Sequence, residues 1–377
     1  MTVLRPTTSA ELEAIVASAG DAGRRLALRG GLTKDGIGLS ETDAEIVDMT
    51  SFAGVIDYDP AELVLTAGAG TPLAEIERLV ADENQMLAFD PFDHGPIFGC
   101  PAGSATIGGI IAAGVGGSRR LSAGGVRDHL LGFTAVSGRG ERFVAGGKVV
   151  KNVTGYDLSK LVCGSWGRLA ALTEVTLKVL PRPRTTATFA LRGQMPPDAV
   201  ATMARAMGSQ ANVAAAAYLP GGITALRIEG FDHSVTARLG LLARLLPGGE
   251  PMPDAEADAL WNMLRTVSPL AGRGPLWRIA IGSRGCADLI ARLGAGSADY
   301  LVDWAGGLVW LVHEGPAEQV REAARRAGGH AMLVRRGALA DTPPLDAQPP
   351  AIAALEARVR RAFDPLGVFE TGRFGQS

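Results

Sequence analysis

The chain has 377 residues, more than one hydrophobic core usually serves, which predicts at least two domains. Hydrophobic residues make up 47% of the chain and charged residues 20%, so a disordered chain is excluded. The net charge of −2 gives no general attraction to nucleic acid or to an anionic membrane, and no nucleic-acid partner is expected. The three cysteines, Cys100, Cys163 and Cys286, have neither metal-site spacing nor the even number of a disulfide framework.

The N-terminal region predicts two units in which a helix and a strand lie next to each other in the sequence. Residues 8–19 predict a helix that starts with a capping box, and residues 25–29 predict a strand. Residues 63–66 predict a second strand, and the helix that follows it is expected to use Thr71 as its cap.

The order of predicted strands and helices changes at a proline-rich connector, Pro181 to Arg184. Before it, strands are expected between residues 132 and 144 and over residues 172–180. After it, residues 185–335 alternate β-prone runs with helical ones, which predicts an antiparallel sheet backed by helices.

The C-terminal region predicts a separate amphipathic helix after a proline-rich link over residues 340–350. Its apolar residues Ile352, Leu355, Val359 and Phe363 recur at helical spacing. We therefore expect these four side chains to face inward.

Two common nucleotide-binding loops are excluded by the residues at their key positions. Gly68-Ala-Gly70 follows a strand, but Leu73 stands where a dinucleotide fold needs a third small residue for close helix–strand packing. Residues 31–34 have the wrong order for a phosphate loop that ends in Gly-Lys-Ser or Gly-Lys-Thr.

Two glycine-rich stretches remain, over residues 29–34 and 101–109. The second holds three glycines together with the hydroxyls of Ser104 and Thr106. Consecutive backbone N–H groups beside small side chains form an anion-binding concavity, so two such walls could clamp one diphosphate. The alternative is that the glycines only allow tight turns.

Three blocks of sequence carry a family resemblance that covers nearly the whole chain. They are residues 103–132, residues 151–176 with Lys-Asn-Val-Thr-Gly-Tyr-Asp-Leu at their start, and Phe363 to Phe369 with Gly372-Arg373. These blocks resemble the vanillyl-alcohol-oxidase (PCMH-type) FAD-binding family. Residues 151–158, 276–279 and 303–310 further resemble the E-subunit group of bacterial glycolate oxidases within that family.

The resemblance implies an α+β fold: a PCMH-type two-subdomain FAD-binding domain with an antiparallel α/β cap domain. Residues 1–182 would form the FAD-binding domain and residues 183–338 the cap, or substrate, domain. Residues 351–377 would form a C-terminal segment that returns to the FAD domain.

The resemblance also implies which residues hold FAD. One pyrophosphate loop would consist of Arg29, Gly30, Gly31, Leu32, Thr33 and Lys34, and the other would be formed by Pro101, Gly103, Ser104, Thr106, Ile107, Gly108 and Gly109. Gly114 would lie under the flavin, and Gly167, Ala170 and Leu172 would meet the adenine end. No histidine lies in residues 29–34, where family members with flavin attached covalently there carry one, so FAD is expected to bind non-covalently.

Four departures from the family pattern concern detail near the flavin. Leu32 replaces a loop glycine, and Trp166 replaces the glutamate of a Gly-Ser-Glu-Gly motif. Residues 122–124 read Ser-Ala-Gly instead of Arg-Tyr-Gly, and residues 370–372 read Glu-Thr-Gly instead of Asn-Pro-Gly.

Oxidation of a small 2-hydroxy acid needs a cation for the carboxylate and a base for the hydroxyl proton. Arg278 is the candidate for the first role, because a guanidinium binds a carboxylate at two points. His94 and His330 are the candidates for the second role, because imidazole accepts protons near neutral pH. The ordinary alternatives are a surface-paired arginine and structural histidines. No two of the five histidines are closely spaced, so no metal site is predicted.

The resemblance implies an FAD-binding subunit of a complex that oxidises glycolate to glyoxylate. Its partners would be a D subunit with FAD, as the main dehydrogenase, and an iron–sulfur F subunit that receives the electrons. Because the cysteines of this chain are not clustered, such a cluster would belong to the partner. Two alternatives stay open: a stand-alone FAD-dependent 2-hydroxy-acid dehydrogenase, and a structural subunit without cofactor, which Leu32, Ala123 and Trp166 favour.

The sequence also bears on location. The N-terminus lacks a basic-then-apolar signal region, and residues 105–117 are too short and glycine-rich to span a bilayer. We expect a cytoplasmic protein without direct membrane insertion, whose association with the inner membrane would be peripheral and through the complex.

Overall fold

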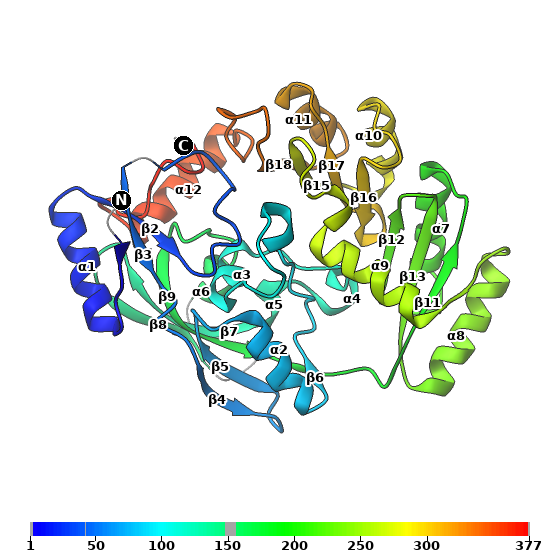
Figure 1. The fold of residues 1–377 in the computed structure, drawn as a ribbon, viewed down its shortest axis with the longest axis horizontal. Coiled ribbons are helices and arrows are strands. Elements are labelled where there is room, and N and C mark those ends of the chain that lie inside the picture. Colours follow the sequence, from blue (N-terminus) through cyan, green and yellow to red (C-terminus); the bar gives the residue numbers. More distant parts are fainter. Residues whose placement is uncertain (1–2, 42, 148–155, 376–377) are drawn as a thin grey trace.

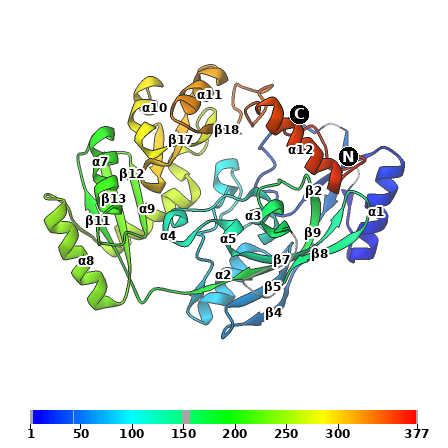
Figure 2. The same cartoon turned by 180° about the vertical axis from the view of Figure 1, so that it is seen from behind.

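The computed structural model describes residues 3–41, 43–147 and 156–375. The sequence block 151–155 therefore lies outside the described residues. Two sheet-based halves lie side by side, and the C-terminal helix returns to the half that contains the N-terminus (Figures 1 and 2).

The N-terminal subdomain is a small parallel sheet with the order β1-β3-β2. Its elements are β1 (Val3–Leu4), α1 (Ser9–Asp21), β2 (Arg25–Arg29) and β3 (Ala44–Asp48). The expected capping box of α1 is only half formed. Thr8 Oγ1 accepts a hydrogen bond from the Glu11 N–H, but the Glu11 carboxylate accepts from the Thr7 N–H instead of closing back on Thr8.

The second subdomain is a five-stranded antiparallel sheet with the order β4-β5-β9-β7-β8. Its strands are β4 (Val55–Asp59), β5 (Val64–Gly68), β7 (Leu130–Ser137), β8 (Arg142–Gly146) and β9 (Ala170–Lys178). A buried apolar cluster joins this sheet to α2 (Leu73–Asp82), α3 (Ile107–Ala113) and α6 (Leu158–Val162).

The expected role of Thr71 as a helix cap is wrong. Pro72 occupies the cap position of α2, and Thr71 Oγ1 donates to the Gly68 carbonyl at 2.6 Å and accepts from the Gly54 N–H at 2.9 Å. The hydroxyl therefore ties two loops together instead of satisfying the first turn of the helix.

Short elements connect this subdomain to the rest of the chain. They are β6 (Gln85–Met86), η1 (Gly95–Phe98), α4 (Arg120–Ala123), α5 (Val126–His129) and β10 (Leu180–Pro181). β10 pairs with β6 just before the chain leaves for the second half of the molecule.

The second half is an eight-stranded antiparallel sheet with the order β14-β11-β13-β12-β16-β17-β15-β18. Its strands are β11 (Thr185–Leu191), β12 (Ala215–Leu219), β13 (Ile223–Gly230), β14 (Glu250–Met252), β15 (Leu276–Ala280), β16 (Tyr300–Asp303), β17 (Leu308–Val312) and β18 (His330–Arg335). The α+β class and the antiparallel cap sheet are thus confirmed. The boundaries at residues 182 and 338 stay a prediction; they fall between β10 and β11 and after β18.

The helices of the cap domain cover the two faces of this sheet unequally. They are α7 (Pro196–Met207), α8 (Asp232–Leu245), α9 (Asp254–Thr266), α10 (Cys286–Arg292) and α11 (Ala317–Arg326), with short turns η2 (Ser268–Leu270), η3 (Ser283–Gly285) and η4 (Trp304–Gly306). Residues of α7, α8, α10 and α11 share one buried cluster with Trp277. The opposite face packs against α9 and against residues of the FAD half.

That second face carries the side chains that matter for a site between the halves. Arg278 on β15 pairs in register with Trp310 on β17 and with Met332 on β18, so all three side chains point to the same side of the sheet. Trp310 stacks on Phe92 of the FAD half, with ring centroids 4.7 Å apart. Arg278 therefore faces the FAD half, whereas its neighbour Trp277 is buried in the other cluster.

The C-terminal helix α12 (Pro350–Phe363) corrects one expectation. Ile352 and Leu355 do not face inward: they are 45% and 53% exposed, and Val359 and Phe363 are only half-buried. The segment is anchored beyond the helix, where Asp364 accepts hydrogen bonds from the N–H groups of Val368 and Phe369. Because that turn is fixed and its apolar residues are buried in the core, the helix is positioned by its C-terminal end, where the Phe363 ring also contacts Phe143 with centroids 6.0 Å apart.

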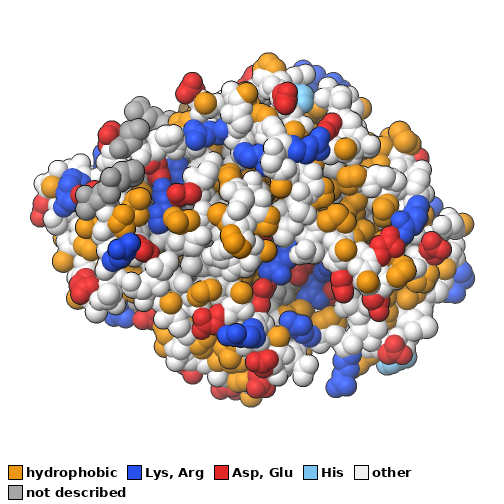
Figure 3. Space-filling view, in the orientation of Figure 1, with side chains coloured by type: hydrophobic (Ala, Val, Ile, Leu, Met, Phe, Trp, Pro, Cys, Tyr) orange, Lys and Arg blue, Asp and Glu red, His pale blue; other side chains and the backbone are white. Residues whose placement is uncertain are grey.

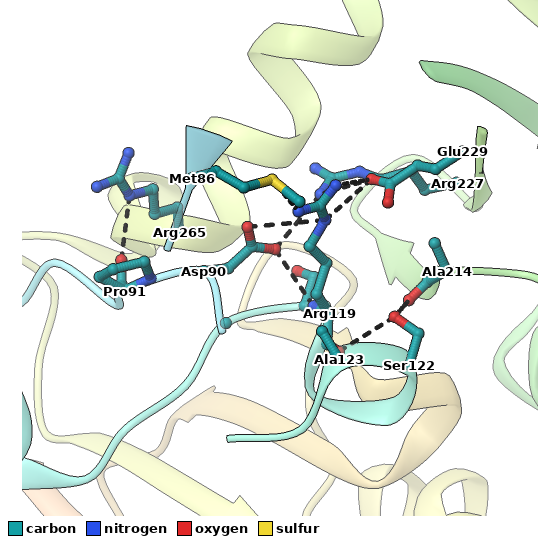
Figure 4. A network of polar contacts seen from close by, with 12 residues as sticks. Met86, Asp90, Pro91, Arg119, Ser122, Ala123, Ala214, Arg227, Glu229 and Arg265 are labelled. Atoms are coloured by element: carbon teal, nitrogen blue, oxygen red, sulfur yellow. Dashed lines mark hydrogen bonds and ion pairs between the residues drawn. The ribbon is translucent and has the colours of Figure 1, made fainter. Parts of the chain in front are cut away.

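Charged side chains gather in a hollow between the two halves (Figure 3). The hollow contains about 1390 Å³ of space open to solvent. Arg119 of the FAD half donates to Glu229 of β13 through Nε at 2.9 Å, and Asp90 lies 3.4 Å from Arg227 (Figure 4). This network of ion pairs connects the cap to the FAD half.

Candidate functional site

A cavity of about 820 Å³, partly open to solvent, lies between the two subdomains of the FAD half. It brings together both glycine-rich stretches and the segment before β9. Its lining consists of Leu28, Arg29, Gly30, Gly31, Leu32, Thr33, Lys34, Asp35, Met49, Ala69, Thr106, Gly108, Gly109, Ala112, Ala113, Ser165, Trp166, Gly167, Ala170, Leu172 and Arg373.

The loop of residues 29–34 offers unused backbone donors to this cavity. The N–H groups of Gly31, Leu32, Thr33 and Lys34 donate no hydrogen bond within the part of the chain that the structure describes. Gly31 also lies in tight contact with the other stretch, because a Cβ at this position would lie 1.9 Å from the Ser104 carbonyl oxygen. Successive free N–H groups of this kind bind phosphate oxygens.

Charges in the cavity are unevenly compensated. Arg29 is neutralised by Asp35, at 2.5 Å from its Nε, and by Glu41. Lys34 has no ion pair among the described residues, and its Nζ donates to Thr33 Oγ1 at 3.2 Å. Burial and the charge of the nearby Arg373 together lower the pKa of Lys34 to about 8, against the opposing effect of Asp93.

Five of the residues expected to bind FAD lie outside this lining, and their roles stay predictions. Pro101 is exposed, and the Gly103 N–H donates to Asp93. Ser104 contacts the cavity loop only through its carbonyl, as noted above. Ile107 is buried in the core and its N–H donates to Thr71, and Gly114 ends α3 with a φ of 65°.

Much of the remaining lining of the cavity is apolar. Gly167, Ala170 and Leu172, all expected at the adenine end, line it together with Leu28 and Met49. Ser165 adds one polar group here: its Oγ is buried and has no hydrogen-bond partner in the described part of the chain. An apolar wall with an unsatisfied hydroxyl suits an aromatic ligand that carries polar atoms.

Two departures from the family pattern adopt backbone conformations that usually need glycine. Leu32 has a φ of 56° and Trp166 a φ of 57°, both in the left-handed region. The turn that the replaced loop glycine would make is therefore kept by Leu32 at a cost in strain. Trp166 is held by its N–H, which donates to the Ala112 carbonyl at 2.8 Å.

The three expected catalytic residues lie in both halves of the molecule, His94 in the FAD half and Arg278 and His330 on the neighbouring cap strands β15 and β18, and their catalytic roles stay predictions. His94 is buried, its ring packs edge-on against Phe92 at 4.6 Å, and its Nδ1 has no partner among the described residues. Burial lowers the pKa of His94 well below its ordinary value, and the charges of Lys34 and Arg278 add to this effect. His330 is exposed; partial burial of its ring and the Arg278 charge lower its pKa.

Arg278 is an unpaired cation in the described structure. Its Nε is buried without a hydrogen-bond partner, and its guanidinium lies 5.1 Å from the ring centre of Trp304. Burial and then the nearby Arg120 lower the pKa of Arg278 to about 10. Arg120 lies 4.6 Å from the same ring, a pairing that sequence reasoning missed because the two arginines are far apart in the chain.

Asp303 is a second buried charge that sequence reasoning missed. It accepts hydrogen bonds of 2.7 Å from Ser118 Oγ of the FAD half and from the Trp304 N–H. Burial raises the pKa of Asp303 from 3.8 to about 6. Between these two pH values the folded chain holds a proton that the unfolded chain has lost, so stability falls as pH rises through this range.

Asp303→Asn is therefore expected to become more stable relative to the wild type as pH increases. The difference in the free energy of unfolding should grow by about 1 to 2 kcal/mol between pH 4 and pH 7, because only the wild type must ionise a buried group. Denaturant unfolding of both proteins at the two pH values measures this growth. A difference that does not change with pH would contradict the assignment.

Comparison with known proteins places these features in a family. The family model described as an FAD binding domain matches residues 2–146. Glycolate oxidase subunit GlcE of Escherichia coli (strain K12) is 36% identical over 351 residues, which cover 92% of each chain. The chain belongs to the glycolate oxidase subunit GlcE family. It is thus a PCMH-type flavoprotein of an FAD-dependent oxidoreductase family, and its cofactor is FAD.

More distant relatives share part of the chain. A D-lactate dehydrogenase of Archaeoglobus fulgidus is 34% identical over 182 residues, which cover 48% of this chain and 39% of that enzyme. Among solved structures, p-cresol methylhydroxylase is 13% identical and superposes with a TM-score of 0.71 over 99% of this chain and 88% of its own. That likeness shows the fold. None of the helices in the described part is long and apolar enough to cross a membrane.

The residues present fit FAD. The free N–H groups of residues 31–34 and the uncompensated Lys34 suit a pyrophosphate, and the apolar part of the lining with Ser165 suits an aromatic ring system.

Proposed function

We propose that this chain binds FAD non-covalently in the cavity and acts as a subunit of a complex that oxidises glycolate to glyoxylate. In this proposal a flavin-containing D subunit is the main dehydrogenase and an iron–sulfur F subunit receives the electrons. The carrying observation is the 36% identity to a glycolate oxidase subunit over 92% of the chain.

Features of the chain support the cofactor part. Residues 29–34 contain no histidine to which flavin could be attached covalently. Cys100, whose thiol is the other group considered for such a link, lies outside the cavity lining. The N–H groups of residues 31–34 would donate to phosphate oxygens, and Lys34 would supply charge. Leu28, Met49 and Leu172 would contact the adenine. When bound, FAD would supply an electron carrier between the D subunit and the F subunit.

The partner and location parts rest on the sequence. The cysteines are too scattered to hold an iron–sulfur cluster, so that cluster would belong to the F subunit. If the complex associates with the inner membrane, its other subunits would make that contact.

The substrate part rests on Arg278 and His94. Arg278 would bind the carboxylate of a small 2-hydroxy acid, which would restore the counter-charge that the guanidinium lacks. His94 would take the hydroxyl proton at Nδ1. Its pKa is lowered partly by two cations, so anions bound at Lys34 and Arg278 would raise that pKa and make the ring a better base. His330 is the second candidate base, on the edge of the same sheet face.

The test is an absorption spectrum of the purified chain reconstituted with FAD, before and after anaerobic addition of glycolate. A flavin spectrum that stays oxidised until D and F are added supports a role in which the FAD of this chain relays electrons within the complex or completes a site shared with the D subunit. A chain that never takes up FAD would contradict the proposal and favour a structural subunit.

A stand-alone 2-hydroxy-acid dehydrogenase is the second candidate, favoured by the position of Arg278 and His94 on the two sides of one interface. It predicts that glycolate alone bleaches the flavin. Arg278→Ala should then raise KM for glycolate by about 10- to 100-fold, because a charge-assisted hydrogen bond is lost. Arg278→Lys keeps the positive charge and should raise KM less. Steady-state kinetics with a dye acceptor measure KM. An unchanged KM with an unchanged flavin spectrum would remove Arg278 from the site.

A further inference from the structure

We propose that Arg373, which the C-terminal tail places at the cavity, is a cofactor-binding residue that forms with Lys34 a pair of cations around the pyrophosphate of FAD. This inference rests on the proposed function. It adds a residue 339 positions after Lys34 to a site otherwise built from the first half of the chain.

The tail is fixed against the loop that follows Lys34. Arg373 donates through Nε to the Ile37 carbonyl at 2.7 Å and through its terminal nitrogen to the Lys34 carbonyl, and its own carbonyl accepts from the Leu39 N–H at 2.8 Å. Gly38 permits this approach: its φ is 88°, and a Cβ there would lie 2.5 Å from the Arg373 carbonyl oxygen. The guanidinium is thereby held at the cavity wall before any ligand binds.

Two cations of the lining have no ion-pair partner in the described part of the chain, which suits a ligand with two negative charges. The lining holds three cations, Arg29, Lys34 and Arg373, and one carboxylate, Asp35. Arg29 is already neutralised by Asp35 and Glu41. Lys34 and Arg373 make no ion pair among the described residues, and each is buried enough for its pKa to be lowered. A pyrophosphate diester carries two negative charges and would compensate both cations.

A second set of contacts holds the tail in place. The ring of Phe374 lies between two guanidinium groups, 5.7 Å from that of Arg168 and 5.8 Å from that of Arg373. It also contacts the ring of Trp166 at 5.4 Å. Arg168 in turn pairs with Glu370 at 2.9 Å. These contacts restrict the motion of Arg373, so less conformational entropy is lost when it binds an anion.

The competing explanation is that Arg373 only braces the loop through its two carbonyl acceptors. Charge separates the two explanations. Arg373→Gln keeps a hydrogen-bond donor without charge, and Arg373→Lys keeps the charge without the planar fork. A phosphate ligand requires the charge, whereas a brace requires the donors.

The experiment is a titration of the full-length apoprotein with FAD, followed by flavin fluorescence, for the wild type and three variants at Arg373. We expect FAD affinity to fall about tenfold or more in Arg373→Met and in Arg373→Gln, and by only a few-fold in Arg373→Lys. Arg358→Met, on the exposed side of α12, is the matched control and should bind as the wild type does. Circular dichroism checks that each variant is folded.

The dependence of affinity on pH provides a second readout. Because Arg373 lowers the pKa of Lys34, the loss of affinity above about pH 8 should move to higher pH in Arg373→Met. Wild-type affinity in Arg373→Gln, or equal losses in Arg373→Lys and Arg373→Met, would overturn the role of Arg373 while leaving FAD binding intact. A wild type that binds no FAD would overturn the proposed function as well.

Discussion

Gly31→Ala is expected to lower FAD affinity by about 100-fold or more. The new Cβ would lie 1.9 Å from the Ser104 carbonyl oxygen and 3.0 Å from its carbonyl carbon. Backbone atoms on both sides cannot rotate away, so the two glycine-rich stretches must separate by more than about 1 Å, a displacement that commonly costs two orders of magnitude when it misplaces binding groups. Titration with FAD measures the loss.

Gly240→Ala is the matched control for this substitution. Gly240 lies within α8, and a Cβ there would meet only Arg244 Nη1 at 3.7 Å, an ordinary contact. Alanine should stabilise that helix by up to about 1 kcal/mol and leave FAD affinity unchanged. If Gly31→Ala bound FAD as tightly as Gly240→Ala, the cofactor would not lie between the two stretches.

Arg119→Met is expected to lower the free energy of unfolding by about 3 kcal/mol. The Arg119 side chain is only 6% exposed and contacts Glu229 through two nitrogens, at 2.9 and 2.6 Å. Its removal leaves the Glu229 carboxylate, which is only 15% exposed, with Arg227 at 3.9 Å as the remaining cation. Breaking one side of a buried pair is costly because the other charge loses its compensation. Denaturant unfolding followed by tryptophan fluorescence measures the change.

Two further variants show whether the pair itself is responsible. Arg119→Met combined with Glu229→Met should recover most of the lost stability, since both charges are then absent. Arg292→Met removes an exposed partner of Asp288 and should change stability by less than about 0.5 kcal/mol. A loss in the double variant as large as in the single one would show that Arg119 acts through packing and not through charge.

The sequence predicted the elements of the fold well where local signals are strong. The β-prone run before the proline connector became β9, and those after it became β12, β13, β15 and β17 of the cap sheet, whereas β11, β14 and β16 were not predicted. The errors came where a side chain had a choice of partners. The Thr71 hydroxyl binds the Gly54 N–H and the Gly68 carbonyl instead of the first turn of the helix, and the Glu11 carboxylate accepts from the Thr7 N–H instead of the Thr8 N–H. In both cases the path of the neighbouring backbone decides which partner is within reach.

The helix α12 shows a different limit. Its helical spacing of apolar residues was read correctly as a helix, but the face that packs was not. A hydrophobic pattern predicts that a helix has an apolar face, but it does not predict whether another part of the chain packs against that face. Here the buried turn at Asp364 decides the orientation, and Ile352 and Leu355 remain in solvent.

For the site, the glycine stretches and the loop of residues 29–34 were accessible from sequence because they are continuous. Ser165, Asp303 and the Arg120–Trp304–Arg278 arrangement were not, because each depends on residues that meet only after folding. Arg373 belongs to a C-terminal motif of the sequence, but no local signal indicates its position beside Lys34.

The sequence by itself determined the family, the class of cofactor and the two glycine-rich walls, because these reside in short runs of residues with fixed local geometry. The tertiary structure decided which cations remain without an ion-pair partner at the cavity and which face of the cap sheet packs against the FAD half. Charge compensation and burial depend on distances between segments that are far apart in the chain, and such distances exist only in the folded molecule.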